Sequence, residues 1–155
     1  MANQFKLEEK FYQADLDIKD GLFDDAVTKL EEIIEEDPKF GKAYNHLGWL
    51  YETKFKNLKL ADRYYQLAIK YAPDYSAGYT NYAVLLSTLG KFEELKAHLD
   101  VAIEVPGINK STIYNEYGIM YEQLGDYSKA IENYKLSAKS TLSDDTLNRA
   151  MASIK

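Results

Sequence analysis

One pattern of aromatic and small residues recurs through this sequence about every 35 positions. In its clearest copy, residues 112–138, aromatic side chains and a glycine fall at i, i+3, i+4 and i+7, which is one face of an α-helix. A Leu-Gly-Asp turn follows, and then a second helical stripe with an alanine at its centre. The residues of this copy are Tyr114, Tyr117, Gly118, Tyr121, Gly125, Tyr127, Ala130, Tyr134 and Ala138. Small residues at facing positions let two antiparallel helices approach closely, so the stretch predicts a helical hairpin.

Three further copies lie upstream, and the one at the N-terminus is the faintest. The copies begin near Leu7, Gly41, Ser76 and Ser111, so the period is 34 or 35 residues. The copy that begins at Gly41 carries Tyr44, Leu47, Gly48, Tyr51, Ala61, Tyr65, Ala68 and Pro73. An aromatic, Leu-Gly, Tyr, Ala and Pro pattern at this period resembles the tetratricopeptide repeat (TPR) over nearly the whole chain.

This resemblance implies an all-α fold, an α-solenoid in which antiparallel helix pairs stack into a right-handed superhelix. The chain would then form a single array over residues 1–155, since stacked repeats bury their apolar faces against one another. We expect a last helix after Ser143, which would act as its N-cap, with Leu147, Ala150, Met151 and Ile154 on one face. The expected units are about 7–40, 41–75, 76–110 and 111–142, followed by a capping helix at about 144–154.

Composition excludes several classes of partner. The net charge is −6, and the isoelectric point near 5.0 argues against a nucleic-acid surface, which needs a basic stripe. It argues against an anionic membrane surface as well. No apolar run approaches the roughly 18 residues of a membrane span. The N-terminus shows no secretory signal, so we expect a cytoplasmic protein.

Catalytic and metal-binding chemistry is not indicated by any pattern in the sequence. There is no cysteine, and the two histidines, His46 and His98, belong to different helices of different units. Paired carboxylates such as Glu31 and Glu32 lie on a solvated helix face, where nothing raises one pKa for acid–base work. We therefore expect no enzyme, no cofactor and no metal site.

The resemblance also implies a binding groove. In this family the first helix of each pair lines the inner, concave surface, and its residues not used for packing face a ligand. By spacing, the groove residues would be Phe11, Asp15, Asn45, His46, Trp49, Glu52, Asn81, Val84, Asn115, Glu116, Ile119 and Glu122. An extended peptide from a protein partner would lie along them.

Three features of this predicted groove suggest how it binds. Trp49 is an aromatic residue surplus to packing and a candidate anchor, and it shares its repeat place with Val84 and Ile119. For Val84 and Ile119, packing against neighbouring helices is an equal alternative. The amides of Asn45, Asn81 and Asn115 could pair with a peptide backbone, or simply face solvent. The acidic residues Asp15, Glu52, Glu116 and Glu122 outnumber Lys42, so we expect a preference for a neutral or basic segment.

One TPR subfamily binds the acidic C-terminal tails of heat-shock chaperones through a clamp of lysine, arginine and asparagine. In one alignment these places hold Phe11, Asp15, His46, Ala77 and Asn81, and one unit later they hold Asn45, Trp49, Asn81, Thr112 and Glu116. Neither set contains a lysine or an arginine, so we expect no binding of such tails.

The leading hypothesis is therefore an adaptor or scaffold that binds a peptide segment of a partner in its groove. Two alternatives remain open at this point. The atypical N-terminal unit could stack on another copy of the chain, which would give a homo-oligomer. The chain could instead be an accessory module that acts through its convex face.

Overall fold

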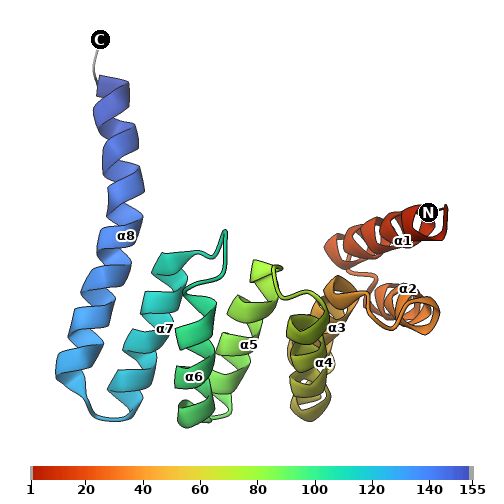
Figure 1. Cartoon of the computed structure of the whole chain (residues 1–155), viewed down its shortest axis with the longest axis horizontal. Helices are drawn as coiled ribbons and strands as arrows, with labels where there is room; N and C mark the ends of the chain where they lie inside the picture. Colours follow the sequence, from red (N-terminus) through yellow and green to blue (C-terminus); the bar gives the residue numbers. More distant parts are fainter. Residues whose placement is uncertain (1, 154–155) are drawn as a thin grey trace. The chain divides into compact units, whose positions relative to one another are not determined.

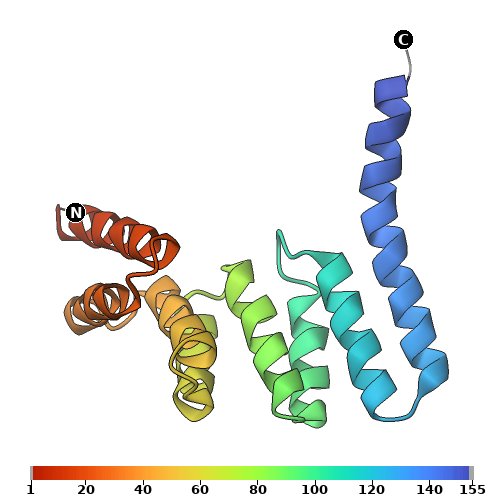
Figure 2. The same ribbon diagram turned by 180° about the vertical axis from the view of Figure 1, so that it is seen from behind.

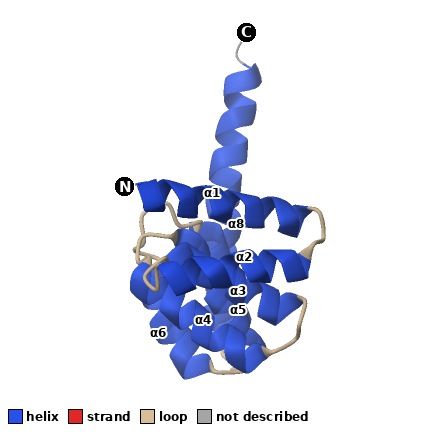
Figure 3. Cartoon of the chain, turned by 90° about the vertical axis from the view of Figure 1, so that its right-hand side faces the viewer, coloured by secondary structure: helices blue, strands red, loops and turns tan. Residues whose placement is uncertain are grey.

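The computed structural model describes the backbone of residues 2–153, without the side chains of residues 2, 143–148, 150, 151 and 153. All regular structure in this range is helical (Figure 3). The expected all-α fold of paired helices is confirmed. The helices are α1 (Ala2–Lys19), α2 (Phe23–Glu36), α3 (Gly41–Thr53), α4 (Leu58–Tyr71), α5 (Ser76–Thr88), α6 (Phe92–Ala102), α7 (Lys110–Gln123) and α8 (Tyr127–Ser153).

The chain divides into two compact units, Met1–Leu85 and Leu86–Lys155. The boundary between them falls within α5. In the first unit α1 packs on α2, α2 on α3, and α3 on α4 (Figure 1). In the second unit α6, α7 and α8 lie side by side in that order (Figure 2). The single array of four repeats stays a prediction, whereas the helix pairs within each unit are observed.

A glycine in the first helix of a pair makes room for a tyrosine from the second. A Cβ on Gly48 would lie 2.7 Å from the ring of Tyr65, and a Cβ on Gly118 would lie 2.6 Å from the ring of Tyr134. The same contact therefore joins α3 to α4 and α7 to α8. The small residues of the sequence pattern are explained by this close approach.

Tyrosines near the start of α3 and α5 form hydrogen bonds with the loops that precede these helices. The hydroxyl of Tyr44 donates to the carbonyl oxygen of Pro38 at 2.7 Å, and that of Tyr79 donates to the carbonyl oxygen of Pro73 at 2.8 Å. Each proline ends a repeat, and its carbonyl is bonded six residues later. The aromatic and proline positions of the repeat are therefore linked by a hydrogen bond in both places.

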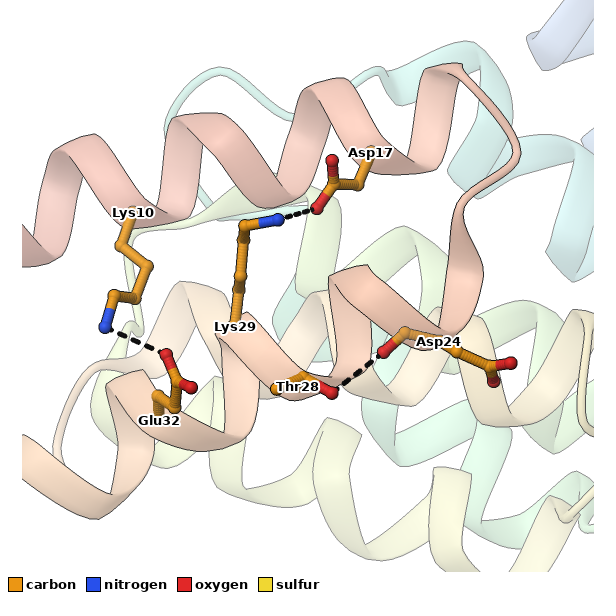
Figure 4. A network of polar contacts seen from close by, with 6 residues as sticks. All are labelled: Lys10, Asp17, Asp24, Thr28, Lys29 and Glu32. Carbon is orange, nitrogen blue, oxygen red and sulfur yellow. Dashed lines mark hydrogen bonds and ion pairs between the residues drawn. The ribbon is translucent and has the colours of Figure 1, made fainter.

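Apolar packing holds α1 against α2. Two ion pairs join the same helices, as Figure 4 shows. Ala14, Leu30 and Ile33 are completely buried between these helices and α3. Lys10 pairs with Glu32 at 2.9 Å, and Lys29 pairs with Asp17, whose carboxylate raises the pKa of that lysine. Exposed pairs typically contribute less than about 1 kcal/mol each, so the apolar contacts dominate.

The predicted separate capping helix is wrong. α8 runs from Tyr127 to Ser153 without interruption, so Ser143 lies inside this helix and not at the start of a separate one. Neither proline nor glycine occurs in this range, and serine and aspartate are tolerated in a helix interior at a small cost. The C-terminal part of α8 extends beyond the end of α7 (Figures 1 and 2). The predicted packing face of Leu147, Ala150, Met151 and Ile154 lies outside the described side chains.

The turn between α3 and α4 contains a strained residue. Lys56 has a φ angle of 57°, which is a left-handed conformation. All other residues of the described chain with a positive φ are glycines. We expect Lys56→Gly to raise the free energy of unfolding by about 1 kcal/mol, because glycine removes the steric cost of this conformation. Thermal denaturation checks this. Lys59→Gly, at an exposed position inside α4, should lower stability instead, and a gain in both variants would contradict the explanation.

Candidate functional site

A pocket of about 290 Å³ lies in the first unit, where α1, α3 and α5 come together. It brings together five of the residues that repeat spacing placed in the groove. Two more of its residues, Ile18 and Ala77, come from the same helix faces. The lining consists of Asp15, Ile18, Asn45, His46, Trp49, Tyr75, Ala77 and Asn81.

A chain of polar contacts crosses this pocket and links the three helices. Nε2 of His46 in α3 lies 2.5 Å from Oδ1 of Asp15 in α1. The side-chain amide of Asn81 in α5 donates to Oδ1 of Asn45 at 3.0 Å. Nδ2 of Asn45 lies 3.4 Å from Nδ1 of His46 and closes the chain. One wall of the pocket is therefore a continuous polar path from α1 to α5.

The neighbours of His46 determine its protonation state. Its Nε2 faces the Asp15 carboxylate and its Nδ1 lies beside the Asn45 amide, so a neutral ring that donates from Nε2 can accept at Nδ1. Burial lowers the pKa of His46, and the opposing effect of Asp15 is smaller. At neutral pH the imidazole is uncharged, and Asp15 brings one negative charge to the pocket.

The aromatic walls of the pocket already attract cations from the chain itself. The ammonium of Lys54 lies 5.5 Å from the ring centroid of Trp49, and that of Lys42 lies 5.6 Å from the ring centroid of Tyr75. A positive charge at this distance is drawn to the electron-rich face of an aromatic ring. Trp49 is half-buried and also packs against the apolar core of the first unit, so it is only partly surplus to packing.

Two of the predicted groove residues have other roles. Phe11 is only 9% exposed and packs against the rings of Phe40 and His46, so its placement in the groove is wrong. The aromatic side chain fills space between α1 and α3 that spacing alone left empty. Asn45 is 3% exposed and its amide is already bonded to its neighbours, so the interpretation of Asn45 as an open peptide contact is wrong too.

The predicted acidic residues Glu52 and Glu122 accept hydrogen bonds within their own hairpins. The hydroxyl of Tyr65 donates to Glu52 at 2.6 Å, and that of Tyr134 donates to Glu122 at 2.9 Å. These are the tyrosines that lie on the two packing glycines. Both carboxylates therefore help to join the two helices of a pair, which repeat spacing did not reveal.

The remaining predicted residues are not among those that line this pocket. Val84 is 44% exposed in the first unit, and in the second unit Asn115 is exposed and Ile119 is half-buried. Glu116 in α7 is buried, and none of the described residues offers its Oε2 a hydrogen bond. A groove that runs through all these positions stays a prediction.

Tyr75, which lies in the turn before α5, is a pocket residue that repeat spacing does not predict. The spacing refers to positions inside the first helices, and Tyr75 precedes such a helix. Its position two residues after Pro73, where the chain turns toward the next first helix, is the signal that could have revealed it.

A second pocket, of about 350 Å³, lies between α6 and α7 in the second unit. None of its residues is among those that repeat spacing placed in the groove. The lining consists of Phe92, Glu93, Lys96, Ala97, Asp100, Met120, Tyr121 and Leu124. In the described part of the chain, no group of three acidic or histidine side chains is arranged to hold a metal ion.

Removal of the buried charge of Glu116 is expected to stabilise the protein. Burial raises the pKa of this carboxyl above its ordinary value of 4.5, so the ionised form destabilises the folded state at neutral pH. Glu116→Gln should raise the free energy of unfolding at neutral pH by about 1 kcal/mol. Since both states hold a protonated carboxyl below pH 4.5, the gain should vanish in acid; urea denaturation at both pH values tests this. Glu132→Gln, at an exposed position of α8 in the same unit, is the matched control, and an equal gain there would contradict the explanation.

Comparisons with known proteins agree with the architecture. The family model of the tetratricopeptide repeat matches residues 41–75 and 111–142. Similar solved structures include MamA, with a TM-score of 0.81 and 19% identity over 94% of this chain and 84% of that one. PilF of Pseudomonas aeruginosa has a TM-score of 0.80 at 20% identity, over 90% of this chain and 63% of its own. PilW, a type IV pilus biogenesis factor, has a TM-score of 0.77 at 21% identity, over 87% of this chain and 62% of its own.

These structural likenesses, all at low identity, establish the fold. A search of curated protein sequences gives no significant match. Among the helices of the described residues, none has both the length and the apolar character that crossing a membrane requires.

Proposed function

From the premise that this chain carries tetratricopeptide repeats at residues 41–75 and 111–142, we propose that it is a protein–protein interaction scaffold. A peptide segment of the partner would bind at the pocket between α1, α3 and α5. The proposal includes a cytoplasmic location and a role without catalysis. What supports it most is one observation: five groove residues chosen by repeat spacing line a single pocket.

The chemistry of this pocket suits a peptide. Ligand sites combine apolar and aromatic walls with a few polar groups that fix orientation. Here Trp49, Ile18 and Ala77 supply the apolar surface, while Asn81 and Asp15 supply the polar groups. A half-buried tryptophan beside amide groups would anchor one side chain and pair with the backbone next to it.

Affinity capture from the source cell tests the proposal. The variant Trp49→Ala combined with Asn81→Ala removes the anchor and one amide, and we expect it to recover much less partner than the wild type. The control combines Asn115→Ala with Ile119→Ala, which changes predicted groove residues outside the pocket. Thermal denaturation must show that both variants are folded. If the pocket variant recovered as much partner as the wild type, the pocket would not be the binding site.

Acidic C-terminal peptides of the chaperone type are expected not to bind. Asp15 would repel a carboxylate, and no cation is among the lining residues. Isothermal titration calorimetry with such a peptide should give no measurable heat of binding. A micromolar dissociation constant would contradict this expectation.

Self-assembly is a second candidate function, favoured by the surface of α1. Phe5 is 74% exposed, Tyr12 is 61% exposed and Leu16 is 39% exposed. Their spacing of seven and four residues places them on one face of the helix. Sedimentation velocity over a range of concentrations should then show oligomers that Phe5→Ser with Tyr12→Ser removes. A monomer at high concentration would rule this candidate out.

A further inference from the structure

We propose that the pocket between α1, α3 and α5 selects a cationic side chain of the bound segment, with arginine preferred over lysine. This inference rests on the proposed function and adds the class of residue that the partner must present. The juxtaposition that carries it is a partly exposed carboxylate, Asp15, in a pocket walled by Trp49 and Tyr75.

The charge of the pocket favours a cation. Asp15 is the one acidic residue of the lining, and its side chain is 39% exposed. Its Oδ1 is engaged by His46, which leaves Oδ2 for a donor from outside. Asn45 and Asn81 carry no charge, and His46 is neutral at physiological pH because it is buried. Among the lining residues Asp15 is therefore the one that carries a charge.

The aromatic rings add a second attraction for a positive group. Each of the two rings already has a lysine ammonium within 6 Å of its centroid, as described for Lys54 and Lys42. Burial raises the pKa of the Tyr75 phenol, and the negative charge of Asp15 raises it further. Lys42 at Tyr75 is thus an internal competitor for the cation of a partner.

Size and shape restrict the ligand to one side chain. Ligand pockets for whole small molecules span about 300–1,000 Å³, and this one, at about 290 Å³, lies at the lower limit. A planar guanidinium can stack on the ring of Trp49 while it donates to the Asp15 carboxylate and to the amide oxygen of Asn81. A lysine ammonium can approach the carboxylate or a ring as a point charge, but it has no planar fork that stacks on the ring and donates to two acceptors at once, which is the reason for the preference.

Trp49 is the single tryptophan of the chain, so its fluorescence reports directly on this pocket. The probe is N-acetyl-arginine amide, and the reference is N-acetyl-citrulline amide, which has the same shape without the charge. We expect the arginine probe to bind about 10-fold more tightly, a difference of about 1.4 kcal/mol. Asp15→Asn should reduce this ratio to near one while it leaves the citrulline affinity unchanged, which also shows that the variant is folded.

A second variant gives a change in the opposite direction. Lys42→Gln removes the internal competitor, so the arginine probe should bind a few-fold more tightly than it does to the wild type. Lys110→Gln makes the same charge change in the second unit, at an exposed position, and should have no effect. Equal gains in both variants would mean that overall charge is responsible, and the proposal would fail.

Two further results would overturn the inference. One is equal affinity for the arginine and citrulline probes, and the other is no saturable change in emission at the highest soluble concentration of the arginine probe. Either result would refute the selection of arginine without refuting the scaffold proposal. If capture of a partner still depends on Trp49 and Asn81, the pocket binds a peptide without selecting its charge.

Discussion

Gly41→Ala is expected to lower the free energy of unfolding by about 2–3 kcal/mol. A Cβ at this position, the first residue of α3, would lie 2.5 Å from the Cβ and 2.6 Å from the backbone nitrogen of Ala72, and 2.8 Å from the carbonyl carbon of Tyr71. Two of these three atoms belong to the backbone at the end of α4, which cannot rotate away as a side chain can. The start of α3 would have to move away from α4, and urea denaturation would record the loss.

Gly78→Ala is the matched control, with the opposite sign. A Cβ there would meet only ordinary contacts, at 3.9 Å from Ala68 and Ile69. Since Gly78 lies inside α5, alanine should raise stability by up to about 1 kcal/mol through its higher helix propensity. If both variants lost stability equally, the close approach at Gly41 would not be the cause.

Ala130→Trp is expected to destabilise the second unit by about 1–3 kcal/mol or more, because it overpacks a full interior. Ala130 in α8 is 3% exposed, on the side of the helix that packs against α7. An indole in this position would have to displace neighbouring side chains or separate the two helices. Thermal denaturation of the purified variant measures the effect.

Lys129→Trp places the same indole one residue earlier. The side chain of Lys129 is 57% exposed, so the larger group can extend into solvent and the cost should be small. Adjacent helix residues differ by about 100° in direction, and the pair therefore tests the helix phase read from the sequence. Equal effects at both positions would mean that this phase is wrong.

The fold could be predicted from the sequence because the repeat is a pattern of side-chain sizes. The spacing predicts that small residues face one another across the hairpin, whereas the structure places the ring of Tyr134 against Gly118. Gly48 and Tyr65 repeat the arrangement. What spacing could not predict was the end of the chain. Ser143 can start a helix or continue one, and without a proline or glycine to stop α8, the helix continued.

The site could be predicted only in part, for a related reason. Spacing tells which helix face a residue occupies, and the structure brings Asp15, Trp49 and Asn81 together around one pocket. It does not tell how long the neighbouring side chains are. Phe11 shares the predicted face but is covered by Phe40 and His46, which belong to other elements.

The polar chain from Asp15 to Asn81 has a consequence for how the first unit opens. Detachment of α1 from α3 would break the His46–Asp15 bond and dismantle one wall of the pocket in the same event. Occupancy of the pocket and detachment of α1 are therefore thermodynamically linked. A molecule held in the pocket should slow amide hydrogen exchange throughout α1, including turns of the helix that it never touches.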